Sequence, residues 1–274
     1  MKSKINYNVI LFVLLLFAPS YPLSEEYDLQ NDNSTFPSSI VVIEIVLDGV
    51  VGQANGVYLN VKNELYLVTA GHVLFDSDSN VRVSYKTILS SVSSNKSDSS
   101  LHMFSLNLVE SSAHGDVRYW EDIDLAVVRM TQSSNKPSDY VQIIQRANYP
   151  LTSFSVKDSR NCDSIYWLCW VNLVGYTDVT GSNLSRNDLE ILSGQILAVR
   201  RHSPTFVMSF RSKNGYSGAP IFIECEEDGD GKTYFCGIHT STFEWDEEGD
   251  SLHTGMVSIG TCADVIFDRI EESW

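Results

Sequence analysis

The sequence predicts an all-β fold made of two consecutive sets of strands. Short runs of β-branched and aromatic residues alternate with turn-forming residues, a pattern that is typical of sandwiches and barrels. The polar segment 131–138, which contains Pro137, separates the two sets, and only one segment near the C-terminus has helical spacing of apolar residues. We therefore expect a first strand set over residues 38–135 and a second strand set with a short helix over residues 136–274, each a sandwich or a barrel.

The first set of predicted strands is rich in valine, isoleucine and leucine. Its members are Ile40–Leu47, Val57–Val61, Leu65–Val68, Val81–Tyr85, Leu101–Leu108 and Leu125–Met130. Glycine and asparagine favour turns, so we expect Gly52–Gly56 to be a turn that precedes the second strand. Serine-rich Ser90–Ser100 lacks core-forming residues and is predicted to be a polar loop.

The second set contains six more strands and the helix. The strands are Trp167–Tyr176, Leu189–Val199, Thr205–Ser209, Ile221–Cys225, Tyr234–Ile238 and Gly255–Ile259. In Cys262–Ile270 the apolar residues Val265, Ile266 and Ile270 recur at near-helical spacing, which predicts a C-terminal helix.

The N-terminal segment predicts export. Lys2 and Lys4 precede the apolar run Val9–Ala18, and small residues follow it, so we expect residues 1–20 to be a signal peptide and 21–37 an N-terminal extension. The run is about half of the ~20 residues that a membrane-spanning helix needs, and we expect a secreted chain without a membrane anchor. The net charge of −16 argues against nucleic acid or an anionic membrane as a partner.

Five cysteines in an exported chain suggest disulfides and one spare thiol. Cys225 and Cys236 flank an acidic turn, so we expect a hairpin to pair them. Cys162 and Cys169 are close enough in sequence to close a small loop, which leaves Cys262, although some of the five could simply be buried thiols. Sequons at Asn33, Asn95 and Asn183 permit glycosylation in a eukaryotic host.

Three motifs place catalytic residue types beside predicted strands. They are Thr69–Val73 with His72, Asp124–Val128 with Asp124, and Gly215–Pro220 with Ser217. A serine hydroxyl needs a base to take its proton, and a carboxylate fixes the imidazole of that base. A strand-end aspartate that only caps a turn is the alternative for Asp124, whereas most of the other histidines are expected to lie in turns or on the surface.

The order His72, Asp124, Ser217 resembles that of chymotrypsin- and trypsin-like serine proteases, and differs from the order in subtilisins and α/β-hydrolases. The resemblance implies two six-stranded Greek-key barrels, a catalytic triad of these residues, and an oxyanion hole made by the N–H groups of Gly215 and Ser217. It also implies hydrolysis of protein or peptide substrates through an acyl-enzyme. We expect a monomer that uses no cofactor and no metal.

Two departures from trypsin are informative. Tyr216 occupies the position where trypsin-type zymogens carry a carboxylate, so we expect no activation by pairing with a new N-terminus. Gly237-Ile238-His239 is similar to a motif of bacterial glutamyl endopeptidases, in which the histidine lines the primary specificity pocket.

Arg211, Ser212 and His239 are therefore predicted to bind the residue before the cut, with a preference for Glu and also for Asp or Gln. Arg211 could instead face solvent, His239 could be an ordinary core histidine, and Thr242 could narrow the pocket. The main alternative to an endopeptidase is a catalytically silent protease homologue that acts as a secreted binding or regulatory module. A third possibility, a small secreted β-domain that matches by chance, is disfavoured by three motifs in order.

Overall fold

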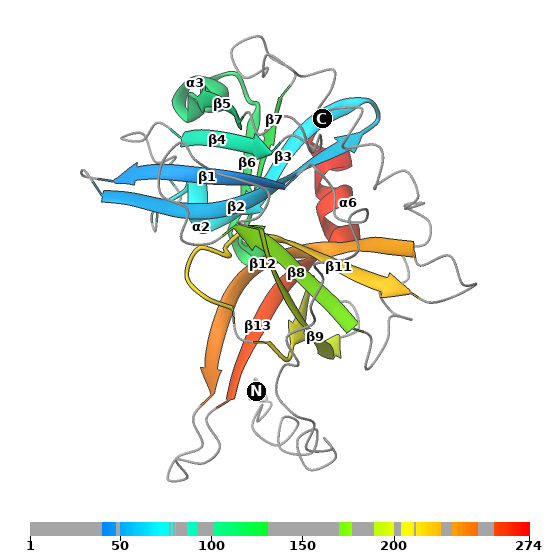
Figure 1. The fold of residues 1–274 in the computed structure, drawn as a ribbon. Coiled ribbons are helices and arrows are strands. Elements are labelled where there is room, and N and C mark those ends of the chain that lie inside the picture. The colour runs from blue at the N-terminus through cyan, green and yellow to red at the C-terminus, as the bar shows by residue number, and fades with distance from the viewer. Residues whose placement is uncertain are drawn as a thin grey trace, which may run out of the picture. The chain divides into compact units, whose positions relative to one another are not determined.

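The computed structural model contains one seven-stranded sheet, one closed barrel and a C-terminal helix. Figure 1 shows the sheet in the upper half of the view and the barrel in the lower half. The structure describes residues 40–47, 50–76, 78, 80, 87–92, 101–130, 170–176, 189–199, 204–210, 212–225, 232–245 and 255–274. Several predictions fall outside these residues. They concern the signal peptide, the extension, the boundary between the two strand sets, the sequons, Val81–Tyr85, Cys162, Cys169 and Arg211.

The first sheet positions His72 and Asp124, which lie next to the ends of two neighbouring strands. Its strands have the order β5-β4-β1-β2-β3-β7-β6, and each neighbouring pair is antiparallel. Seven strands therefore stand where six were predicted. Their bounds are β1 (Ile40–Leu47), β2 (Val50–Val61), β3 (Glu64–Ala70), β4 (Thr87–Val92), β5 (Leu101–Leu106), β6 (Val117–Trp120) and β7 (Leu125–Arg129).

The second set of strands forms a closed six-stranded barrel in the order β10-β13-β12-β11-β8-β9. Antiparallel pairing of β9 with β10 closes the ring, as Phe206↔Val199 illustrates. The prediction of a second six-stranded barrel is confirmed. The bounds are β8 (Trp170–Tyr176), β9 (Leu189–Val199), β10 (Thr205–Met208), β11 (Pro220–Cys225), β12 (Lys232–Trp245) and β13 (Gly255–Cys262).

Short helices join or follow the strands. They are α2 (Gly71–Leu74), α3 (Leu108–Ala113), the 3₁₀ turn η2 (Glu121–Ile123) and α6 (Ala263–Ser273). The helix predicted at the C-terminus is α6, whereas α3 was not expected. Asn107 begins α3 because its side chain accepts a hydrogen bond from the Glu110 N–H, a typical helix cap.

Alternation along the strands builds three apolar clusters. In β1, Val41 and Ile43 face the core of the first sheet, whereas Ile40 and Val42 face a second cluster that also contains residues of the barrel. Ile266 and Ile270 of α6 belong to this shared cluster, and a third cluster fills the barrel itself. The two strand sets are thus held together by a common apolar core, next to which the candidate site lies.

One loop prediction is wrong, and a second is wrong in its first residues. Gly52–Gly56 is not a turn but the middle of β2, because Leu47 pairs with Val50 and the chain already reverses there. Residues 50–57 of β2 then pair with β1 without interruption. The first residues of the predicted serine loop are also extended, since β4 includes Ser90 and Ser91 and pairs with β1 and β5.

The predicted Cys225–Cys236 disulfide does not fit the barrel. Cys225 lies opposite Lys232, and Cys236 is four residues further along β12, beyond the Phe222↔Phe235 pair. Four residues along a strand span about 13 Å, whereas bridged Cα atoms lie within about 7 Å. The hairpin thus sets the two cysteines at different levels rather than opposite each other.

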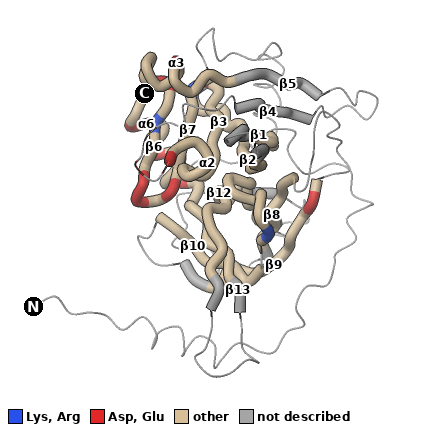
Figure 2. The backbone as a smooth tube through the Cα atoms, turned by 90° about the vertical axis from the view of Figure 1, so that its left-hand side faces the viewer, with Lys and Arg blue, Asp and Glu red and all other residues tan. Residues whose placement is uncertain are grey.

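Charge and hydropathy add two observations. Figure 2 shows acidic segments around β6 and α6, where Glu121, Asp122 and Asp268 are exposed. Among the described residues, no helix is both long and apolar enough to cross a membrane.

Candidate active site

His72 and Asp124 meet through two hydrogen bonds at the end of the first sheet. His72 lies in α2, directly after β3, and Asp124 lies between η2 and β7. The His72 ring Nδ1 is 2.7 Å from Asp124 Oδ2, and the His72 backbone N–H donates to Asp124 Oδ1 at 2.8 Å. Both carboxylate oxygens therefore hold the same residue, which fixes the plane and direction of the imidazole ring.

Ser217 completes the arrangement from the barrel side. The His72 Nε2 atom is 2.8 Å from Ser217 Oγ, so one imidazole bridges a hydroxyl and a carboxylate. The His72 side chain is 49% exposed, so the imidazole is accessible from solvent. The three residues that the motifs singled out are thus brought together, although 145 positions separate His72 from Ser217.

The loop that carries Ser217 is shaped by two glycines with positive φ. Gly215 has φ +100° and Gly218 has φ +79°, conformations that residues with a Cβ rarely adopt. A Cβ on Gly218 would also collide with Asn55 O and Thr69 Oγ1 of the first sheet. The Gly218 N–H donates to His239 O at 2.8 Å, so the loop is held by both strand sets.

Asp124 sits in an unusual backbone conformation. Its φ of 49° and ψ of 47° are left-handed, which is uncommon for a residue other than glycine and costs free energy. The Gly71 N–H donates to Asp124 O at 2.7 Å, and Thr261 Oγ1 from the barrel donates to Ile123 O at 2.8 Å. These bonds hold the strained residue from both sides.

Tyr119 covers the backbone next to the imidazole. A Cβ on Gly71 would collide with the Tyr119 ring, which stacks on Phe75 with centroids 4.4 Å apart. Burial raises the pKa of Tyr119, and the nearby charges of Asp124 and Glu121 raise it further. Glycine at position 71 therefore leaves room for the Tyr119 ring to pack against the backbone beside His72 and Asp124.

A second polar cluster lies beneath the Ser217 loop. His239 of β12 is 3% exposed, and its Nε2 atom is 2.8 Å from Ser212 Oγ. The Ser212 hydroxyl also contacts the Thr242 hydroxyl. Burial lowers the pKa of His239 to about 4, against smaller opposing contributions from the backbone of Tyr216 and Ser241. His239 is therefore a neutral imidazole near pH 7, not a group that becomes charged there.

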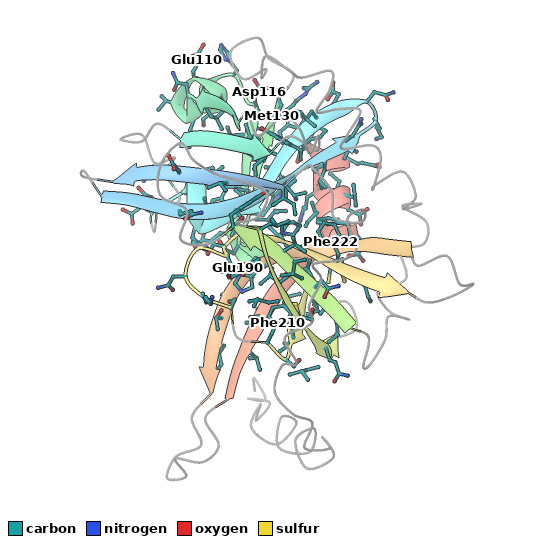
Figure 3. All side chains as sticks on the ribbon, viewed as in Figure 1. Glu110, Asp116, Met130, Glu190, Phe210 and Phe222 are labelled. Carbon is teal, nitrogen blue, oxygen red and sulfur yellow. The ribbon has the colours of Figure 1, made fainter. Side chains whose placement is uncertain are left out.

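Tyr216, the residue before Ser217, is fully buried. Its hydroxyl donates to Glu190 Oε2 at 2.9 Å, and Lys213 Nζ lies 3.3 Å from the same oxygen. Glu190 projects from β9 and is labelled in Figure 3. Tyr216, which stands where trypsin-type zymogens carry a carboxylate, thus binds the carboxylate of Glu190 through its phenol hydroxyl.

The sequence did not indicate several residues that support the candidate site. Glu190 and Thr261 contact the site from distant segments, whereas Tyr119 lies five residues before Asp124, and no local motif marks any of the three. Asn55 did carry a signal, since it is polar and lies between apolar strand residues, but it fell inside the segment expected to be a turn. Within the described residues, no group of three His, Cys, Asp or Glu side chains could hold a metal ion.

Comparison with solved structures identifies the fold. The thermostable serine protease AL20 from an extremophilic microorganism matches with a TM-score of 0.50 at 11% identity, over 87% of this chain and 95% of that one. The protease Anisep from Arthrobacter nicotinovorans matches with a TM-score of 0.47 at 14% identity, over 84% and 91%. The serine endoprotease from Yersinia pestis matches with a TM-score of 0.48 at 13% identity, over 86% and 63%.

No family model and no curated protein sequence matches this chain. The likeness to the AL20 protease establishes that the chain has the fold of chymotrypsin-like serine proteases. At 11% identity it establishes the fold alone.

Proposed function

We propose that the chain is a serine endopeptidase in which Ser217, His72 and Asp124 form the catalytic triad. The observation that carries the proposal is the continuous relay from Ser217 Oγ to His72 Nε2 at 2.8 Å and from His72 Nδ1 to Asp124 Oδ2 at 2.7 Å. A relay of this geometry, with a half-exposed imidazole, is what acyl transfer to a peptide carbonyl requires.

In the proposed reaction Ser217 Oγ attacks the scissile carbonyl carbon while its proton moves to His72 Nε2. The resulting imidazolium is stabilised by Asp124, and its proton then goes to the leaving amine as the C–N bond breaks. Water repeats the sequence on the acyl-enzyme and releases the carboxylic acid. Each step conserves protons through His72 and needs no cofactor.

We assign the oxyanion hole to the N–H groups of Gly215 and Ser217. The positive φ of Gly215 and the anchored carbonyl of Ser217, which accepts from the Asn55 N–H at 2.8 Å, support this assignment. Preorganised backbone donors of this kind are worth about 10²–10³ in kcat each.

We assign primary specificity to Ser212 and His239, together with Arg211, which rests on sequence alone. The neutral imidazole and the serine hydroxyl offer hydrogen bonds rather than charge, which suits a Glu or Gln side chain before the cut. Thr242 contacts Ser212 and so restricts the depth of this pocket. Cleavage of peptides that differ only in that residue tests the assignment, and dominant cleavage after Arg, Lys or a large apolar residue would refute it.

We further propose that the seven-stranded sheet is the first barrel of a double-barrel protease and that the chain is exported as a monomer. The shared apolar core between sheet and barrel supports the first point, and the sequence of residues 1–20 supports export. Localisation of a tagged full-length chain tests export.

A fluorophosphonate probe tests the proposed activity directly. Wild-type protein should be labelled on Ser217, as peptide mapping would confirm, and Ser217→Ala should remove both labelling and peptide hydrolysis, with kcat lower by about 10⁴–10⁶. His72→Ala should slow labelling comparably. A folded wild-type chain that is neither labelled nor active on a peptide library would favour the silent homologue.

A further inference from the structure

Asn55 is a fully buried polar residue in the middle of β2. Its side chain crosses from the first sheet to the barrel, where Nδ2 donates to Tyr176 O at 2.9 Å and Oδ1 accepts from the Tyr176 N–H at 2.8 Å. Nδ2 also donates to Gly215 O at 2.7 Å. One side chain therefore binds the end of β8 and the loop that carries the nucleophile.

The surroundings of Asn55 match a carboxamide and no other small side chain. They present one N–H donor, from Tyr176, and two carbonyl acceptors, from Tyr176 and Gly215. A carboxamide supplies one accepting oxygen and two donating hydrogens, so every bond is satisfied in a single orientation of the amide. A carboxylate of the same shape would turn oxygen toward two carbonyl oxygens, and an alanine would leave all three groups without this partner.

The backbone of Asn55 extends the same link toward both halves of the triad. Its N–H donates to Ser217 O at 2.8 Å, and its carbonyl accepts from Thr69 Oγ1 at 2.7 Å. Thr69 lies three residues before His72, near the end of β3. Asn55 thus connects the strand that leads to the base with two carbonyls of the loop that carries the nucleophile.

The bond to Gly215 matters most for chemistry. It fixes the carbonyl of the Gly215–Tyr216 peptide at 2.7 Å, whereas the N–H of the same peptide donates to Lys213 O over a longer 3.4 Å, and glycine at φ +100° tolerates rotation that other residues would resist. If this peptide rotates, the Gly215 N–H and the Ser217 hydroxyl lose their common orientation. Binding of the substrate by residues outside this loop would not change, whereas stabilisation of the transition state by the loop would weaken.

We propose that Asn55 is a positioning residue that sets the Ser217 loop against His72, so that its amide controls the rate of acylation rather than substrate binding. This inference rests on the proposed function. It predicts that the effect of Asn55 substitutions falls on kcat and on the rate of covalent labelling, with KM changed little.

The test compares Asn55→Asp, which keeps the shape of the side chain, and Asn55→Ala with wild type. Active-site titration counts the competent enzyme, and kcat, KM and the fluorophosphonate labelling rate are then expressed per titrated site. We expect kcat and the labelling rate to fall at least tenfold in both variants, with KM within about threefold. Hydrogen exchange of the peptide spanning 212–219 should rise in the same variants.

Asn172 provides the matched control. It is also a buried asparagine, lies on β8, and accepts from Ser193 Oγ at 2.6 Å, and among the described residues its side chain has no hydrogen bond to residues 212–219. Asn172→Ala and Asn172→Asp should lower thermal stability while leaving kcat per site and loop exchange near wild type.

Two results would overturn the proposal. One is an Asn55→Ala or Asn55→Asp enzyme with wild-type kcat per titrated site, and the other is a kcat loss that Asn172 variants of equal stability reproduce. An inert wild-type chain would instead count against the proposed function, and loop exchange would still decide whether Asn55 orders the loop. If Asn55→Ala does not fold, Asn55→Asp and Asn55→Ser carry the comparison.

Discussion

His239 should make the folded chain sensitive to mild acid. Burial holds its pKa at about 4 in the folded state, against 6.5 for the unperturbed side chain. Below pH 6.5 the unfolded chain binds a proton at this residue, whereas the folded chain stays neutral there until about pH 4. The stability that His239 contributes is therefore complete above pH 6.5 and is lost as the pH falls toward 4.

The size of this loss follows from the two pKa values. Proton linkage gives about 2 kcal/mol lost between pH 8 and pH 5, which corresponds to about 4–8 °C in Tm for a chain of this size. The group is 3% exposed, so solvent screening does not reduce the effect substantially. Other titrating groups, such as Asp116, whose pKa is raised mainly by burial, add their own slopes.

A pair of variants isolates the contribution of His239. His239→Gln keeps a group that can bond Ser212 but cannot titrate, whereas His114→Gln removes an exposed histidine. Denaturation at pH 8, 7, 6 and 5 should give a smaller acid loss for His239→Gln than for His114→Gln, by about 2 kcal/mol at pH 5. Equal pH profiles for the two variants would refute the buried neutral imidazole.

Four other outcomes are expected. Gly71→Ala should lower stability by about 1–3 kcal/mol because its Cβ collides with Tyr119, and combining it with Tyr119→Ser should cost less than the sum in calorimetry. Tyr216→Phe should lower stability by about 1–2 kcal/mol through the lost bond to Glu190. A chain expressed from Tyr21 should be active without any further cleavage, and a chain that stays inert until it is cleaved would contradict this. The ratio of Glu to Gln cleavage should not vary between pH 6 and 8, because the proposed donor His239 stays neutral; a tenfold change in initial rates would contradict that.

The sequence predicted the relay because its three members lie in local motifs. His72 follows β3, Asp124 precedes β7, and Ser217 stands between two glycines, so strand periodicity and glycine placement locate them without knowledge of the fold. Most of the barrel strands were located for the same reason. Leu189–Val199, for instance, is β9 with unchanged ends.

What the sequence could not predict depends on pairing between distant segments. Gly52–Gly56 looks like a turn by composition, but antiparallel partners in β1 hold it extended, and tertiary pairing outweighs local preference. Cys225 pairs with Lys232, so Cys236 lies four residues further along β12, and the register in which a hairpin closes has no reliable signature in a single sequence. Glu190 reaches Tyr216 because it lies opposite Gly175 in the β8–β9 ladder and Gly175 lies against the Tyr216 ring.

The polar bonds between the two strand sets explain why the site is both strained and ordered. Thr261 of the barrel holds the carbonyl before left-handed Asp124, and Asn55 of the first sheet holds the carbonyls on either side of Tyr216. Each strand set thus fixes the half of the relay that the other set carries. Since apolar contacts are not directional, the shared core alone would permit the two sets to slide. Hydrogen bonds of 2.7–2.8 Å at these points set the separation of Ser217 from His72, and a change in either set is expected to be felt at both residues.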